Sequence, residues 1–237
     1  MDIQGIAIGI LFGLGIPILV IVGIVYFILK IKSGITIAIS FRFALRAYFY
    51  VAILVSIGLA GLGGLSTLIN VGFGEIVDRE FSYGNVYEDH RELQIRLKNS
   101  DYIDEYDDTE RSLPEKVELE MKGSLITGIS LTLIGTFILV VHFFGRILVE
   151  TKEERGDVLR RLYLIIGLGI FAIVTVISLA SAVPETLRYV ILDGGRGDES
   201  PGEALAISIV ALPIWVCYLV ATLRNVRRIS NSPETVK

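Results

Sequence analysis

The chain has 237 residues, 52% of them apolar, with a mean hydropathy of +0.63 and a formal net charge of −4. This hydropathy excludes an ordinary water-soluble domain and indicates a helical protein that crosses the membrane several times. The single cysteine, Cys217, excludes an internal disulfide framework.

Five apolar segments are each long enough to cross the hydrocarbon core, which requires about 20 residues. In chain order they are residues 5–29, 44–69, 125–145, 162–183 and 204–223. Their apolar residues run continuously rather than alternating, which favours helices over the strands of a membrane barrel. The sequence therefore predicts an all-α protein with five transmembrane helices.

Residues 1–40 are predicted to form the first transmembrane helix and a cytoplasmic linker. No basic stretch precedes the helix and no small-residue cleavage site follows it, so we expect a retained helix rather than a signal peptide. Gly5, Gly9 and Gly13 recur every four residues, a spacing that lets another helix approach closely. The alternating segment 35–43 is interpreted as interfacial rather than as a strand.

Residues 41–157 are predicted to hold the second and third helices, joined by an acidic outside loop at 72–123. Ser56, Ala60 and Gly64 form a second small-residue ridge, for which general glycine enrichment in membrane helices is the alternative explanation. Within the loop, residues 88–99 and 112–122 are expected to be helical. The acidic run 101–110 lacks the spacing of a calcium loop, so we expect it to be solvated.

His142 is the one histidine inside an apolar segment. At helical spacing it shares a face with Gly128 and Gly135, the small side of the third helix, so we expect it to face other helices. A haem iron would normally need a second axial ligand, and His90 lies in the outside loop. Packing with a hydrogen bond is the favoured role, with haem binding or proton transfer as alternatives.

Residues 158–228 are predicted to repeat the preceding two-helix unit, and residues 229–237 to form a flexible cytoplasmic tail. Arg46-Ala-Tyr48 opens the second helix as Arg161-Leu-Tyr163 opens the fourth, and 135–142 aligns with 211–218. Ala211 and Tyr218 then correspond to Gly135 and His142. Ser112 with Glu115, and Ser200 with Glu203, are matching capping boxes before the third and fifth helices. Two such units would lie parallel; the alternative is the general likeness of membrane helices.

The Arg-x-Tyr openings, the Pro213-Ile-Trp215 motif and His142 resemble a bacterial integral-membrane family catalogued as domain of unknown function 5671. The family pattern places Pro-x-Trp and then His on one helix, whereas here Pro213 and Trp215 lie in the second unit and His142 in the first. The resemblance covers about residues 41–228. It implies a membrane location and supplies no activity and no site.

The distribution of charge predicts the orientation. Lys and Arg cluster around residues 30–46, 146–161 and 224–237, whereas the 72–123 loop is rich in carboxylates. Short basic connections stay on the cytoplasmic side. We therefore expect a multi-pass cell-membrane protein whose N-terminus and 72–123 loop lie outside and whose C-terminus is cytoplasmic.

No predicted helix carries a charged residue in its interior, which argues against a pump or an ion-coupled carrier. Neither a phosphate-binding loop nor a paired Cys or His metal motif occurs in the sequence. We therefore expect no enzymatic activity, no cofactor and no metal. The favoured function is a structural or accessory protein that contacts the lipid bilayer and assembles with itself or with a larger membrane complex. The alternative is an uncoupled small-solute channel between the two repeats; an intramembrane enzyme or electron carrier ranks last.

Overall fold

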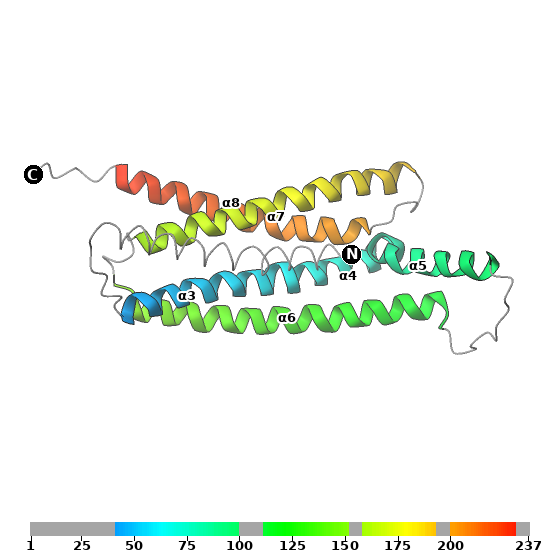
Figure 1. Cartoon of the computed structure of the whole chain (residues 1–237), viewed down its shortest axis with the longest axis horizontal. Coiled ribbons are helices and arrows are strands. Elements are labelled where there is room, and N and C mark those ends of the chain that lie inside the picture. Colours follow the sequence, from blue (N-terminus) through cyan, green and yellow to red (C-terminus); the bar gives the residue numbers. More distant parts are fainter. Residues whose placement is uncertain (1–40, 100–110, 152–157, 193–199, 231–237) are drawn as a thin grey trace, which may run out of the picture.

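The structure is a computed structural model, and it describes residues 41–99, 111–151, 158–192 and 200–230. Its elements are α3 (Phe41–Ile57), the π-helix η2 (Gly58–Leu65), α4 (Ser66–Ile76), α5 (Arg79–Asn99), α6 (Leu113–Val149), α7 (Val158–Ile191) and α8 (Pro201–Ser230). Because α3, η2 and α4 continue one another, the described part of the chain consists of five helices (Figure 1). The predicted all-α class is confirmed.

Four of these helices are long and apolar enough to cross a membrane. They cover Phe41–Ile76, Leu113–Val149, Val158–Ile191 and Pro201–Arg227. The protein is therefore a multi-pass membrane protein, and four of the five predicted transmembrane helices are found. The first one, with Gly5, Gly9 and Gly13, lies outside the described residues.

The helices extend well beyond the apolar segments. The 37 residues of α6 span about 55 Å, whereas the hydrocarbon core is about 30 Å thick. Its polar first turns begin at Ser112, whose backbone N–H donates to Glu115 Oε2 at 3.0 Å in the predicted capping box. The expected loop at 72–123 is thus largely helical, because α4 runs to Ile76, α5 covers Arg79–Asn99, and the helix expected at 112–122 is the start of α6.

The long helices run side by side along the longest axis of the molecule (Figure 1). The continuous helix α3–η2–α4 packs against α6, and α7 packs against α8. Between these two pairs lies the apolar core, which includes Leu54, Leu62, Phe171, Val210 and Tyr218. The shorter helix α5 packs on α4, α6 and α8 at the end opposite to the start of α3.

The π-helix η2 lies in the middle of the first described span. Its sequence, GLAGLGGL, is rich in glycine, and its wider turns leave some backbone carbonyls without their usual helical donors. The hydroxyl of Ser66 donates to the carbonyl of Leu62, and Thr67 Oγ1 donates to the carbonyl of Gly63 at 2.6 Å. These two side chains supply hydrogen bonds that lipid cannot supply.

Candidate functional site

The small residues of the first described span lie against α6. A Cβ added to Gly64 would be 2.5 Å from the backbone nitrogen of Thr132, and one added to Gly135 would be 2.6 Å from that of Ala60. A Cβ on Gly128 would meet the side chain of Leu68 at 2.8 Å. The two helices therefore approach to backbone contact. Ser56, also buried, donates to a carbonyl of its own helix.

Ala211 and Tyr218 are both buried in the apolar core, and Tyr218 faces α7. The hydroxyls of Tyr218 and Tyr163 are 2.6 Å apart, within a hydrogen bond. The ring of Tyr218 lies over Gly167, where an added Cβ would be 2.2 Å from Tyr218 Cε1. Gly167 therefore makes room for the tyrosine pair, a role that the sequence analysis did not identify.

His142 lies half-buried between α6 and α3. Its Nδ1 is 2.7 Å from the carbonyl oxygen of Ile138, which only accepts, so Nδ1 carries the proton. Nε2 then accepts a hydrogen bond from the Tyr48 hydroxyl at 2.9 Å. The rings of Tyr48 and Phe49 pack beside it, with centroids 5.4 and 6.1 Å away. Both ring nitrogens are engaged in protein contacts.

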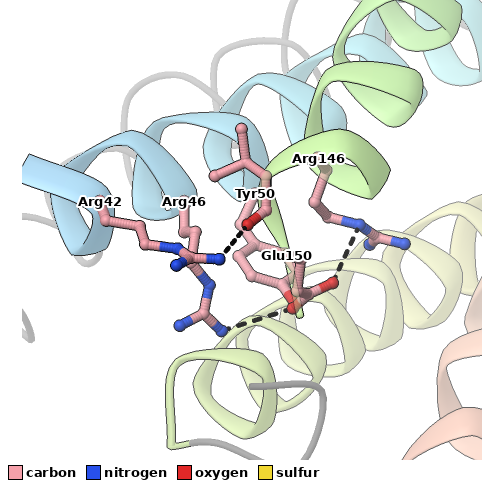
Figure 2. A network of polar contacts seen from close by, with 6 residues as sticks. Arg42, Arg46, Tyr50, Arg146 and Glu150 are labelled. Atoms are coloured by element: carbon pink, nitrogen blue, oxygen red, sulfur yellow. Dashed lines mark hydrogen bonds and ion pairs between the residues drawn. The ribbon is translucent and has the colours of Figure 1, made fainter. Parts of the chain in front are cut away.

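A buried cluster of charges closes the basic end of the α3–α6 pair (Figure 2). At its centre is Glu150, the residue that ends α6. Arg46 Nη2 lies 3.4 Å from Glu150 Oε1, and the two side chains are 3% and 4% exposed. The Tyr50 hydroxyl donates to the same oxygen at 2.5 Å, and Arg146 Nε is 3.6 Å from Oε2. One carboxylate thus joins groups from two helices.

Helical spacing explains how these side chains meet. Arg42, Arg46 and Tyr50 recur every four residues on one face of α3, and Arg146 and Glu150 are one turn apart on α6. Arg42 donates to the carbonyl of Val149 at 2.8 Å, next to the carboxylate (Figure 2). The guanidinium carbon of Arg146 lies 5.4 Å from the Tyr50 ring centroid, a favourable cation–π distance.

Arg42, Arg46 and Arg146 belong to the basic clusters that were expected on the cytoplasmic side, and Glu150 was not singled out. Glu150 lies within the basic stretch 146–161, and its side chain is buried at the end of α6. The spacing of four residues between the charged side chains of α3, and between those of α6, was a usable signal. To predict the cluster from it, one must also know that α3 packs against α6, and a single sequence does not give the packing partners of a helix.

Hydrogen bonds of neutral groups join α5 to its neighbours at the opposite end of the bundle. Ser82 Oγ donates to the carbonyl of Asn70 at 2.8 Å, which joins α5 to α4. Ser200 Oγ accepts from the backbone N–H of Asn85 at 3.3 Å, which joins α5 to the start of α8. A Cβ on Gly202 would meet Asn70 Oδ1 at 2.7 Å, so close packing there requires glycine. The structure begins α8 at Pro201, next to the predicted Ser200 cap.

Within the described ranges, no group of three or more His, Cys, Asp or Glu side chains is placed to hold a metal ion. The basic end consists of ion pairs and hydrogen bonds that join α3 to the end of α6, with guanidinium groups on its rim. Such a rim can hold an anion.

Residues 109–193 match the model of a family described as Domain of unknown function (DUF5671). The DUF5671 segment covers α6, the Glu150 turn and α7. The predicted resemblance is thus confirmed over this segment, which is shorter than the residues 41–228 expected from the motifs. Searches with the chain found no matching curated protein and no matching solved structure.

Proposed function

We propose that the chain is a structural or accessory membrane subunit without enzymatic activity, which assembles with itself or with a larger membrane complex through α6. The observation that carries the proposal is the exposure of this helix. Only 11% of its most apolar stretch is buried, compared with 39–50% for the other three membrane-spanning helices. The most exposed helix belongs to the DUF5671 segment.

The exposed side of α6 is a continuous apolar stripe. Its residues recur at intervals of three or four, and they are Ile126, Ile129, Leu133, Phe137, Val140, Phe144 and Leu148. Gly128 and Gly135 on the other side hold α6 against the preceding span. One face of α6 therefore packs against the preceding span of the same chain. The other face presents large apolar side chains to lipid or to a protein partner.

We further infer that the chain contains two parallel two-helix units, α3–α6 and α7–α8. In the alignment of the units, Tyr48 corresponds to Tyr163 and His142 to Tyr218. The structure joins Tyr48 to His142 and Tyr163 to Tyr218 through their polar ring atoms, so corresponding residues make corresponding contacts. This agreement supports duplication over chance likeness of membrane helices.

The two pairs differ in what covers them. Tyr218 is 6% exposed because α7 and the first unit enclose it, whereas Tyr48 is 56% exposed on the outer side of α3. If the units are equivalent, a partner in the position that the first unit takes toward the second would cover the Tyr48–His142 pair. A second copy or a related subunit against the first unit fits this position.

A crosslinking experiment tests the assembly. In a Cys217→Ser background, we expect Phe137→Cys on the α6 stripe to form disulfide-linked or reagent-linked adducts in native membranes. The matched control is Val176→Cys on α7, which is 66% exposed and also apolar. A dimer-sized adduct supports self-assembly, and a larger specific adduct supports a complex. Equal reaction at both positions, or none at Phe137→Cys, contradicts the proposal.

The alternative is a channel between the two units. The packing of η2 against α8, where the two helix pairs meet, supports this alternative less than it supports assembly. A Cβ on Gly61 of η2 would meet Ile214 at 3.1 Å and Val210 at 3.4 Å, both on α8. Apolar side chains therefore pack directly against the π-helix at this level. We rank assembly above solute passage for this reason.

We also propose that α5 lies outside the cell and the C-terminal end of α8 in the cytoplasm. The basic residues Arg42, Arg46 and Arg146 gather at one end, where short connections are expected to be cytoplasmic. In the Cys217→Ser background, Glu92→Cys on α5 should react with an impermeant maleimide in intact cells. Arg224→Cys should react only after lysis. The reverse pattern would overturn the orientation.

A further inference from the structure

The contact between the two helix units of the chain uses a different face of each unit. The first unit, α3–α6, contributes the side of α3 that carries Tyr50 and Leu54, which are both 3% exposed. The second unit, α7–α8, contributes its aromatic pair, Tyr163 and Tyr218. The rings of Tyr50 and Tyr163 lie 4.8 Å apart. A contact between unlike faces is head-to-tail, and it leaves the other face of each unit for a further contact.

The alignment of the units identifies these two remaining faces. Tyr48 corresponds to Tyr163 in the alignment. Two residues further along each helix, Tyr50 corresponds to Ile165. Tyr48 is 56% exposed and Ile165 is 59% exposed. The first unit therefore exposes the face that the second unit uses inside the chain, and the second unit exposes the face that the first unit uses.

The exposed face of the second unit, called here the Ile165 face, consists of Ile165, Ile173 and Val176 on α7. Their spacing of eight and three residues places them on one side of the helix. The three side chains are 51–66% exposed, and all are large and apolar. Close packing of such side chains drives the association of helices in lipid. This face can therefore pack against another helix pair.

The exposed face of the first unit, called here the Tyr48 face, consists of Tyr48 and Val51 on α3 with His142 on α6. The Tyr48 hydroxyl is bonded to His142 Nε2 at 2.9 Å, so its polar group is already paired. Covering this ring with an apolar side chain would leave no hydroxyl without a hydrogen bond. The enclosed pair of Tyr163 and Tyr218 shows that such an arrangement fits beneath another unit.

The two faces lie at nearly the same depth when two copies have the same orientation in the membrane. Tyr48 is two residues after Arg46, and Ile165 is four residues after Arg161. At 1.5 Å per residue, the two depths differ by about 3 Å. The tyrosines that meet inside the chain have an offset of the same size. Two parallel copies could therefore bring these faces together without a shift along the membrane normal.

We propose that a second copy of the chain docks its Ile165 face against the Tyr48 face of the first copy. This contact rests on the self-assembly and the two parallel units of the proposed function, and it adds a head-to-tail interface beside the α6 stripe. Ile165 of the second copy would lie against Tyr48 as the corresponding rings lie inside the chain. Head-to-tail contacts of this kind build rings when the rotation between copies closes.

The test crosslinks two differently tagged full-length chains in native membranes, both in the Cys217→Ser background. One chain carries Tyr48→Cys, the other carries Ile165→Cys, and a short thiol-specific crosslinker is added. Co-expressed chains should give a dimer-sized adduct that carries both tags. Each variant expressed alone should stay unlinked, as should Val176→Cys, because a head-to-tail contact brings unlike positions together.

Two further cysteine pairs serve as controls. Tyr50→Cys with Tyr163→Cys in one chain should link, because these rings are 4.8 Å apart. Tyr48→Cys in one chain with Val183→Cys in the other should not link. Val183 lies on the same side of α7 and is 53% exposed, but it is 18 residues beyond Ile165, or about 27 Å along the helix.

Three results would overturn the contact. The first is no adduct with both tags although the control pair within one chain links. The second is equal linking through Val183→Cys, which would show that the chains meet without a fixed register. The third is a link within one chain between Tyr48→Cys and Val25→Cys, which would assign the Tyr48 face to the chain's own first apolar segment.

The crosslinking of the α6 stripe is read separately. Adducts of Phe137→Cys without the two-tag adduct would leave the proposed function standing and remove this contact. The two-tag adduct without adducts of Phe137→Cys would keep the contact and remove assembly through the α6 stripe. The two failures are therefore distinguishable.

Discussion

The two helices of each pair are held together by different contacts in the α3–α6 pair and in the α7–α8 pair. The α3–α6 pair uses backbone contact at glycines along its length and a buried ion cluster at its basic end. The α7–α8 pair uses an apolar core and a neutral tyrosine pair over Gly167. The buried charges lie at the ends of α3 and α6, whereas the enclosed hydrogen bond of the α7–α8 pair is neutral. The cost of burying charge in lipid accounts for this division.

The largest effect is expected from removing the carboxylate of the ion cluster. Glu150→Ala takes away the acceptor that Arg46 and Tyr50 share and the counter-charge of Arg146. Removing one partner of a buried pair typically costs about 3 kcal/mol or more. We therefore expect a large fall in the melting temperature of the purified protein in detergent.

Glu118→Ala is the matched control for Glu150→Ala. Glu118 also lies on α6 and pairs with Lys122 four residues on, but the two side chains are 52% and 63% exposed. Exposed pairs contribute little, so the control should melt close to the wild type. Equal effects of the two substitutions would mean that burial of the cluster is unimportant.

The second prediction concerns the glycines of the α3–α6 pair. Gly64→Ala would place a Cβ 2.5 Å from the backbone nitrogen of Thr132, and backbone cannot move aside without separating the helices. Such overpacking should cost about 1–3 kcal/mol. Gly169→Ala on α7, where no atom lies within 4 Å of the added Cβ, is the control and should be neutral or stabilising. Melting temperatures in detergent measure both.

The third prediction compares the two aromatic pairs. Tyr218→Phe removes a hydroxyl from an enclosed hydrogen bond, whereas Tyr48→Phe removes one from a half-exposed bond to His142. Hydrogen bonds between membrane helices average about 0.6 kcal/mol, and the enclosed one has less access to alternative partners. We expect a small destabilisation in Tyr218→Phe and a smaller one in Tyr48→Phe. A larger effect in Tyr48→Phe would mean that a partner covers this pair.

The sequence was sufficient for the architecture in the described part of the chain. The continuous apolar runs were sufficient to predict four spans, because a backbone surrounded by lipid must form its own hydrogen bonds and a long helix does so. The limits of the helices were set too short, since helices continue through polar residues once a cap such as Ser112–Glu115 starts them. The π-helix was missed because GLAGLGGL has the composition of an ordinary membrane helix.

The contacts of the site residues could not be predicted without knowing which helices pack together. His142 was expected on a helix-facing side of α6, and its partner Tyr48 is on α3, almost a hundred residues earlier. Glu150 follows the last turn of α6, and only the approach of α3 encloses its side chain. Periodicity predicts the face on which a residue lies. The residue opposite depends on tertiary packing, which a single sequence leaves open.

The smallest expected effect concerns His142 itself. Both ring nitrogens bond to protein atoms, Nδ1 to the carbonyl of Ile138 and Nε2 to the hydroxyl of Tyr48. Gln offers a donor and an acceptor, so His142→Gln should melt close to the wild type. His142→Ala removes both bonds and leaves a gap beside Phe49, which should lower stability by more than the bond alone. A visible haem absorbance in the wild type that disappears in His142→Gln would contradict the packing role, because an axial nitrogen cannot also accept the Tyr48 proton.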